Sequence, residues 1–204
     1  MGIETRRRTL GILAAIAAMP ALAACGQRTA AAGLKFEYTD ITGLGIGSDF
    51  QLTDQNGRPR SLADFRGKVV AVFFGYTHCP DMCPTALAEL AQAVKQLGNQ
   101  GGELQVLFIT VDPARDTPRV LAKYVPAFDP RFLGLYGNPE TVAKVAATYK
   151  VFFAAQKPNA SGSYTVDHTA AIYLIDRRGR PRLYVGGNRT VSGLVHDVTL
   201  LLNE

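Results

Sequence analysis

The sequence predicts an α/β fold, and three observations support this. Short apolar runs at residues 68–75, 104–111 and 170–175 are rich in β-branched and aromatic residues and too short for buried helices. Amphipathic helical patterns lie between and after these runs. The chain has 204 residues, 47% hydrophobic and 19% charged, which is enough for an ordinary globular core. We therefore expect a buried sheet covered by helices that needs no disulfide or metal for stability.

Two turn signals flank the predicted central strands. Asp54-Gln55-Asn56-Gly57 lies between residues 49–52 and 59–62 and predicts a small hairpin ahead of the first buried strand. Residues 177–180 form a second turn, which leads the third run back into residues 183–186. We expect one hairpin before the buried strands and one at their end.

Four stretches carry apolar residues at helical spacing. These stretches are residues 85–97, 117–125, 138–149 and 191–202. Gly98 supplies a C-cap for the first, Asp116 or Thr117 an N-cap for the second, and Asn138 a start for the third. The order of strands and helices is that of a thioredoxin-like fold with an extra N-terminal β-hairpin, without a domain boundary after residue 34.

The N-terminus has the order of a secretory signal. Three arginines at residues 6–8 precede an apolar stretch that ends in Leu-Ala-Ala-Cys25. The stretch of about fifteen residues is shorter than the ~20 that cross a bilayer. Its end resembles the lipobox of bacterial lipoproteins, in which Cys25 is lipidated. We predict a lipoprotein signal peptide at 1–24, a flexible tether at 25–33 and a domain at 34–204. The alternative is a plain signal peptide in which Cys25 has no role.

Charge and cysteine content narrow the class of protein. The chain has 22 basic and 17 acidic residues, and removal of the signal leaves 19 and 16. This small, scattered excess is not typical of a nucleic-acid-binding surface, so we expect no nucleic-acid partner. Three cysteines in an exported protein leave one unpaired, and lipidation of Cys25 would leave the pair Cys79 and Cys83.

The motif GYTHCPDMCP, residues 75–84, directly follows the first predicted strand. On ideal helical geometry the Cα atoms of Cys79 and Cys83 would lie about 6.2 Å apart, within disulfide range. A bridge across so short a loop would stabilise the fold by only ~2 kcal/mol. Because a helix N-terminus favours the thiolate, we predict that the two thiols either form a redox disulfide or share a metal ion.

His168 is the third candidate ligand. It lies in Val166-Asp167-His168-Thr169, where a thioredoxin would place a cis-proline against its cysteines. In a thioredoxin-like fold His168 would face the cysteine pair. Thiolates favour Cu(I) and an imidazole keeps Cu(II) accessible, so the set suits copper. Zinc with an open position also fits, and the alternative is a buried structural histidine.

For the other polar residues near these motifs we expect structural rather than ligand roles. We expect His78 to face solvent or form a hydrogen bond, and His196 to be exposed on the last helix. Asp112 is predicted in a strand-end turn and Asp116 at a helix start. Asp167 could influence His168 as its neighbour.

Three separated strings carry a family resemblance. GYTHCPDMCP, VDPARDTP (residues 111–118) and VDHTAAIYLID (residues 166–176) are similar to motifs of the Sco/SenC family, copper-binding assembly factors of cytochrome c oxidase. The similarity runs from about Phe36 onward. It implies that Cys79, Cys83 and His168 are copper ligands. One departure is residues 176–179, where many relatives have a proline.

The lipobox-like N-terminus predicts a lipid anchor to the membrane on the periplasmic side of the cell envelope, where some relatives have a transmembrane helix. The family resemblance implies that the anchored domain is a copper chaperone. It would bind one copper ion as Cu(I) or Cu(II), receive it from a periplasmic donor, and assist assembly of the dinuclear copper centre of cytochrome c oxidase subunit II. Transfer of copper and reduction of the target's cysteines both remain open. The alternative function is a thiol–disulfide oxidoreductase. A peroxidase is disfavoured because Tyr76 stands where peroxiredoxins have threonine.

Overall fold

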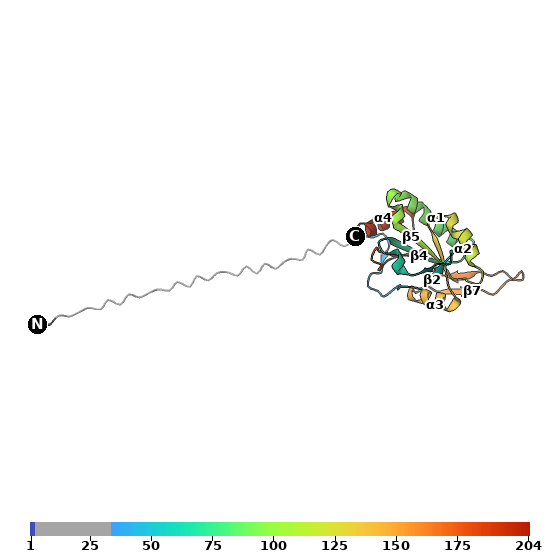
Figure 1. Cartoon of the computed structure of the whole chain (residues 1–204), viewed down its shortest axis with the longest axis horizontal. Coiled ribbons are helices and arrows are strands. Elements are labelled where there is room, and N and C mark those ends of the chain that lie inside the picture. The colour runs from blue at the N-terminus through green and yellow to red at the C-terminus, as the bar shows by residue number, and fades with distance from the viewer. Residues whose placement is uncertain (3–33) are drawn as a thin grey trace. The chain divides into compact units, whose positions relative to one another are not determined.

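Eight strands of the computed structural model form one sheet. They are β1 Thr39–Asp40, β2 Leu52–Asp54, β3 Pro59–Arg60, β4 Val69–Gly75, β5 Leu104–Thr110, β6 Leu133–Tyr136, β9 Ile172–Ile175 and β10 Pro181–Val185. Their order in the sheet is β1-β10-β9-β4-β5-β6-β2-β3. The structure describes residues 1–2 and 34–204, and residues 34–204 form one compact unit (Figure 1). The predicted signal, tether and Cys25 lie outside the described residues.

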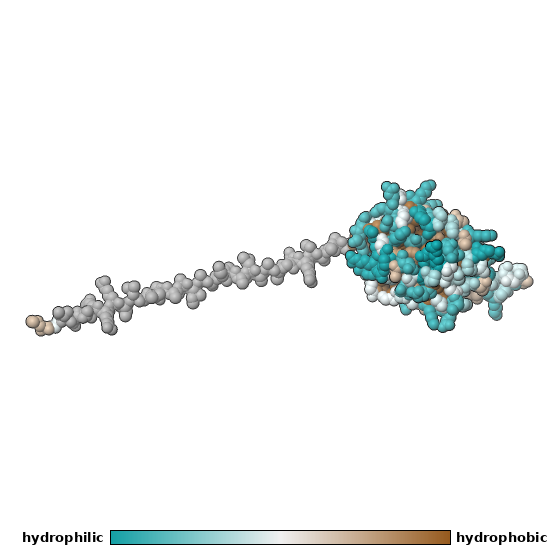
Figure 2. Space-filling view, in the orientation of Figure 1, coloured by the Kyte–Doolittle hydropathy of each residue, from teal (hydrophilic) through white to brown (hydrophobic). Residues whose placement is uncertain are grey.

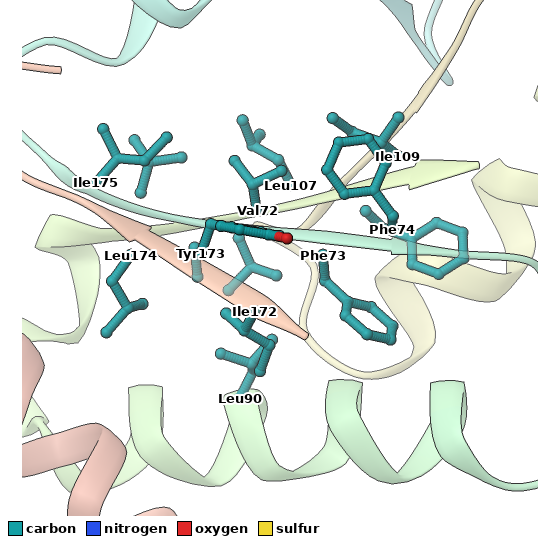
Figure 3. Packing of buried hydrophobic residues seen from close by; sticks show 14 of the residues in the cluster. Val72, Phe73, Phe74, Leu90, Leu107, Ile109, Ile172, Tyr173, Leu174 and Ile175 are labelled. Carbon is teal, nitrogen blue, oxygen red and sulfur yellow. The ribbon is translucent and has the colours of Figure 1, made fainter. Parts of the chain in front are cut away.

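The centre of the sheet is built from the three predicted apolar runs. β4 pairs in parallel with β5 and antiparallel with β9. Every residue of these three strands is buried, because both faces of the sheet are covered. Figure 3 shows Phe73 and Ile172 on the side of the sheet that faces Leu90, and Leu107 and Ile109 on the opposite side.

Four α-helices and three short 3₁₀-helices complete the described part of the chain. They are α1 Met82–Gln96, α2 Pro118–Tyr124, α3 Pro139–Thr148 and α4 Val191–Leu202, with η1 Leu62–Phe65, η2 Gly98–Glu103 and η3 Val125–Ala127. α1 and α4 pack together over one face of the sheet and α3 lies on the other (Figure 1). No helix within the described ranges has both the length and the apolar character that a membrane span requires.

The predicted helix starts are confirmed by their caps, except for the first helix. Thr117 accepts a hydrogen bond from the backbone of α2, and Asn138 accepts one from that of α3 at 2.8 Å. α1 begins at Met82, three residues before the predicted 85, because Pro84 is tolerated in the first turn of a helix. Consequently Cys83 lies in the helix and Cys79 in the loop before it, so ideal helical spacing does not describe the pair.

Several strand pairings were not predicted from the sequence. β6 pairs in parallel with β5, and β2 pairs with β6, so the predicted N-terminal hairpin β2–β3 extends the main sheet. β7 Phe153–Ala155 and β8 Val166–His168 form a separate two-stranded sheet, in which Phe153 lies opposite His168. These strands have three or four residues each, too few for a clear alternating pattern.

Both predicted hairpin turns share one seven-residue pattern, D-x-x-G-R-P-R, at residues 54–60 and 176–182. The glycines, Gly57 and Gly179, have φ values of +80° and +75°, which favour glycine. Asp54 and Asp176 each accept two backbone N–H bonds from their own turn. The recurrence is too short to be an internal repeat, but it gives both ends of the sheet the same turn.

The element order confirms the predicted architecture. β4, α1, β5, the β9–β10 hairpin and α4 form a thioredoxin-like core, and β2–β3 is the extra N-terminal hairpin. The cysteine loop follows the end of β4, and β8 ends at His168 just before β9. This topology brings residues about ninety positions apart to one end of the sheet.

Candidate metal centre

Three side chains converge at the end of β4. The Sγ atoms of Cys79 and Cys83 and a ring nitrogen of His168 all lie within 4.8 Å of one another. The Cys83 Sγ atom and the His168 Nε2 atom are 3.5 Å apart. Both thiols are free. The three residues that the sequence analysis selected as ligands therefore lie together.

The backbone around Gly75 determines where the Cys83 sulfur lies. Gly75 is the last residue of β4, and a Cβ atom there would be 2.8 Å from the Cys83 Sγ atom and 2.8 Å from the Phe108 ring. The chain then turns, with the Cys79 N–H bonded to the Tyr76 carbonyl at 3.2 Å. The Cys83 N–H donates to the Cys79 Sγ atom at 3.4 Å. The turn and the helix start therefore bring both sulfurs to the same place.

The two thiols differ in their exposure. Cys79 is half-buried, whereas Cys83 has no exposed surface. Burial raises the pKa of the Cys83 thiol well above its usual range, so this thiol stays protonated in the metal-free chain. A bound metal cation would replace that proton. Cys79 is the sulfur that a partner molecule can reach.

His168 is oriented by contacts on both sides of its ring. Its Nδ1 atom is 3.3 Å from the Thr169 carbonyl, to which a neutral ring donates its proton. The Nε2 lone pair then faces the cysteines, as a metal ligand requires. Tyr76 and Phe73 contact the imidazole edge to face, with ring centroids 5.7 and 6.3 Å away. Burial lowers the pKa of His168, which keeps the ring neutral and able to bind a metal.

Asp116 lies at the start of α2, as predicted, but it also binds the cysteine loop. Thr117 caps α2, and the Asp116 carboxylate is buried. It accepts the Thr77 N–H at 3.0 Å, the Thr77 hydroxyl at 2.5 Å and the Thr110 hydroxyl at 2.6 Å. Asp116 therefore fixes the loop that carries Cys79 to the end of β5.

Asp112 occupies the predicted strand-end turn, but it also binds a distant loop. The Tyr164 hydroxyl donates to its carboxylate at 2.9 Å, and Arg115 donates to it at 2.5 Å. The Arg115 guanidinium lies 3.5 Å from the Tyr164 ring centroid and donates to the Tyr164 carbonyl at 2.8 Å. These contacts hold the β7–β8 loop beside the site. Sequence patterns do not predict these contacts, because Arg115 and Tyr164 are 49 residues apart.

The remaining candidates lie outside the ligand set. Asp167 accepts a hydrogen bond from Gln156 and is not among the three ligand residues, but its negative charge partly opposes the lowering of the His168 pKa by burial. His78 is 53% exposed and its Nδ1 atom is 3.2 Å from the Thr77 hydroxyl, as predicted. His196 is paired with Asp197 on α4, and its side chain is 45% exposed, also as predicted.

Fold and site together define a class of protein. Two thiols and one neutral imidazole are a soft donor set, suited to copper or zinc and also to dithiol chemistry. The chain is therefore a thioredoxin-like protein in which a histidine replaces the proline that faces the cysteine pair.

Comparison with known proteins identifies the family. The family model SCO1/SenC matches residues 39–203, so the chain belongs to the SCO1/SenC family. It is 49% identical over 152 residues to the mitochondrial protein SCO2 homolog of Bos taurus, covering 74% of this chain and 57% of that protein. The chain thus spans somewhat more than half the length of the mammalian relatives that it matches.

Solved structures agree with this assignment. A structure described as Bradyrhizobium japonicum ScoI with copper bound matches with a TM-score of 0.70 and 43% identity, covering 76% of this chain and 99% of that one. Solution structures of apo Sco1 from Thermus thermophilus match with a TM-score of 0.73 and 38% identity, covering 83% and 99%. These matches show the same thioredoxin-like fold.

Proposed function

We propose that this chain binds one copper ion through Cys79, Cys83 and His168 and assists assembly of the dinuclear copper centre of cytochrome c oxidase subunit II. The observation that carries the proposal is the convergence of these three ligand atoms within 4.8 Å. The relative described as ScoI with copper bound supports the choice of copper. Two thiolates hold Cu(I), and the imidazole lets the same site hold Cu(II).

The site has the features that copper transfer requires. Cys83 is fully buried, whereas Cys79 and His168 are each half-buried, so the ligand set is open to solvent on the side of Cys79 and His168. A partner's sulfur could therefore approach the metal beside Cys79 and take it by exchange of one ligand at a time. Because the Cys83 thiol is protonated when free, copper binding releases a proton there, and copper release takes one up.

Thiol–disulfide exchange is the second candidate function. The half-buried Cys79 beside the fully buried Cys83 is also suited to an attacking thiol with a resolving thiol behind it. The same pair could reduce the cysteines of the oxidase subunit before copper enters. The two candidates differ in their need for His168, because disulfide exchange requires no imidazole on β8.

The location that we propose follows from the N-terminal sequence alone. Residues 1–24 would be a lipoprotein signal, Cys25 the lipidated residue, residues 25–33 a tether, and residues 34–204 the copper-binding domain facing the periplasm. A periplasmic copper donor would then reach the site without crossing the membrane.

Replacement of His168 tests the proposal. We expect His168→Ala to keep near-normal thiol–disulfide exchange and some Cu(I), to lose most Cu(II) binding, and to fail in oxidase assembly, because two thiolates alone lack the nitrogen donor that Cu(II) prefers. Cys79→Ser and Cys83→Ser should lose both oxidation states. Binding is measured on anaerobically purified protein by competition with chelators, and assembly by oxidase activity of complemented cells.

His196→Ala is the matched control, since His196 is an exposed histidine outside the site. If His168→Ala binds both copper ions as tightly as His196→Ala and supports the oxidase equally, His168 is a packing residue. The reductase function would then be the better interpretation.

A further inference from the structure

Two hollows adjoin the Cys79 loop and meet at His78. The first has a volume of about 500 Å³ and is bounded by apolar side chains of α2 and η3, among them Val120 and Ala127, with Lys123 at its edge. The second has a volume of about 470 Å³ and includes Arg115 and Lys157. A molecule that occupies both hollows would lie across the residue next to Cys79.

The lining of both hollows is basic. Lys123, Arg115 and Lys157 contribute positive charge, and no carboxylate lines either hollow. Arg115 is neutralised by Asp112, whereas neither lysine has an ion-pair partner among residues 34–204. Each hollow therefore carries unbalanced positive charge, and both hollows include His78, the residue next to the half-buried Cys79.

Exposed apolar side chains gather at the same end of the molecule. Met82, 39% exposed, directly precedes Cys83. Phe152, 64% exposed, has a carbonyl that accepts the Thr169 N–H at 2.9 Å, one residue from His168. Figure 2 shows a mainly hydrophilic surface in this view. Exposed apolar groups concentrated beside a site are typical of an interaction surface.

We propose that this surface, formed by the two hollows with Met82 and Phe152, docks an acidic segment of a partner protein that carries a cysteine beside an apolar side chain. The apolar side chain would fill the first hollow, carboxylates would face Lys123 and Lys157, and the partner's sulfur would lie next to Cys79. The inference rests on the proposed function, because a copper acceptor or a disulfide substrate both present such a sulfur.

A metal-free exchange reaction tests the surface directly. The full chain with Cys25→Ser and Cys83→Ser keeps Cys79 as its one thiol. The probes are two synthetic peptides, each with a leucine beside a cysteine held as a mixed disulfide with thionitrobenzoate, and flanked by two glutamates or by two lysines. The Cys79 thiolate attacks the peptide sulfur, a disulfide forms between Cys79 and the peptide, and thionitrobenzoate leaves with the electron pair and is measured by absorbance.

We expect the glutamate probe to react faster than the lysine probe, on the order of tenfold at low ionic strength. The ratio should fall as salt screens the charges. Lys123→Glu should remove most of this preference, and Lys157→Glu part of it. Lys95→Glu is the matched control: it makes the same charge change on an exposed position about 18 Å from Cys83 along α1.

The apolar part of the surface has its own test. Replacing the probe's leucine by glycine should slow the reaction of the glutamate probe. Ala127→Gln, an exposed position at the wall of the first hollow, should abolish this difference by filling the space.

Equal rates for both charged probes would overturn the proposal, as would a charge preference that Lys95→Glu removes as strongly as Lys123→Glu. These outcomes are separate from failure of the proposed function, which would appear as loss of copper binding by the unaltered chain.

Discussion

At the scale of single residues, the absence of a side chain at Gly75 is as important as the ligands themselves. The position leaves no room for a Cβ atom between the Cys83 sulfur and the Phe108 ring. Any larger residue must displace the sulfur, the ring or the end of β4. The geometry of the site therefore depends on Gly75, although Gly75 has no side chain and cannot be a ligand.

We expect Gly75→Ala to lower the free energy of unfolding by about 1–3 kcal/mol through overpacking and to weaken Cu(I) binding, because the Cys83 sulfur moves. Urea unfolding and chelator competition measure the two effects. Gly187→Ala is the control, since its Cβ atom would meet nothing within 4 Å. Equal stability and equal copper affinity in the two variants would contradict the packing argument.

At the scale of elements, Asp116 connects three pieces of structure. It lies just before α2 and accepts hydrogen bonds from Thr110 at the end of β5 and from Thr77 in the cysteine loop. Because the carboxylate is buried, its removal leaves buried donors without partners. The conformation of the Cys79 loop thus depends on a residue 37 positions away along the sequence.

Asp116→Ala should lower the free energy of unfolding by about 3 kcal/mol and raise the hydrogen-exchange rate of the Thr77 amide. Copper should bind more weakly because Cys79 is no longer held in place. Asp81→Ala provides the comparison: it changes an exposed carboxylate beside the same loop. If Thr77 exchanges equally slowly in both variants, Asp116 does not hold the loop.

The two D-x-x-G-R-P-R turns predict a pH dependence. Burial by itself would raise the pKa of Asp54 and Asp176, but backbone N–H donors and arginine side chains outweigh it and hold both pKa values below the ordinary 3.8. Each carboxylate therefore stabilises the fold above the pKa of the unfolded chain, and this contribution is lost as pH falls through the lower folded pKa.

We expect the urea midpoint to be constant near pH 6 and to decrease below about pH 4. Asp176→Asn should be less stable than the unaltered chain at pH 6 and should lose less stability between pH 6 and pH 3. Glu140→Gln, which changes an exposed carboxylate on α3, should leave the pH profile as it is. An Asp176→Asn profile parallel to that of the unaltered chain would show that this turn does not contribute.

At the scale of the whole molecule, residues 34–204 form one folded unit, and its candidate site lies at the end of β4. Whether this unit is held at a membrane would depend on Cys25 and the tether. Both are predicted from the sequence alone. Two or more acyl chains give stable attachment, whereas one is marginal.

Cys25→Ser should therefore lose the lipid label and leave the membrane fraction, while its copper binding should be unchanged because Cys25 is not among the three ligands. Metabolic labelling with a fatty acid and fractionation of cells measure the first effect. Membrane retention without lipid on the unaltered Cys25 would contradict the lipoprotein prediction and indicate another anchor.

Local patterns in the sequence determined much of this protein. Apolar runs predicted the buried strands β4, β5 and β9, because a strand buried on both faces is continuously apolar. The residues Thr117 and Asn138 predicted the starts of α2 and α3, because a cap acts within one turn of its helix. The spacing of Cys79 and Cys83 predicted a thiol pair, because the two cysteines are only four residues apart.

Only the tertiary structure decided the contacts between distant residues. The Nε2 atom of His168 contacts the sulfur of Cys83, although the two residues are 85 positions apart in the sequence. The pairing of β8 with β7 determines where His168 lies. From the spacing alone His168 could equally have been a buried structural histidine, and the family resemblance was needed to favour a ligand. The structure also shows that Asp116, at the start of α2, binds the cysteine loop. These arrangements depend on which elements pack together, and a pattern within a few residues carries no information about packing across the sheet.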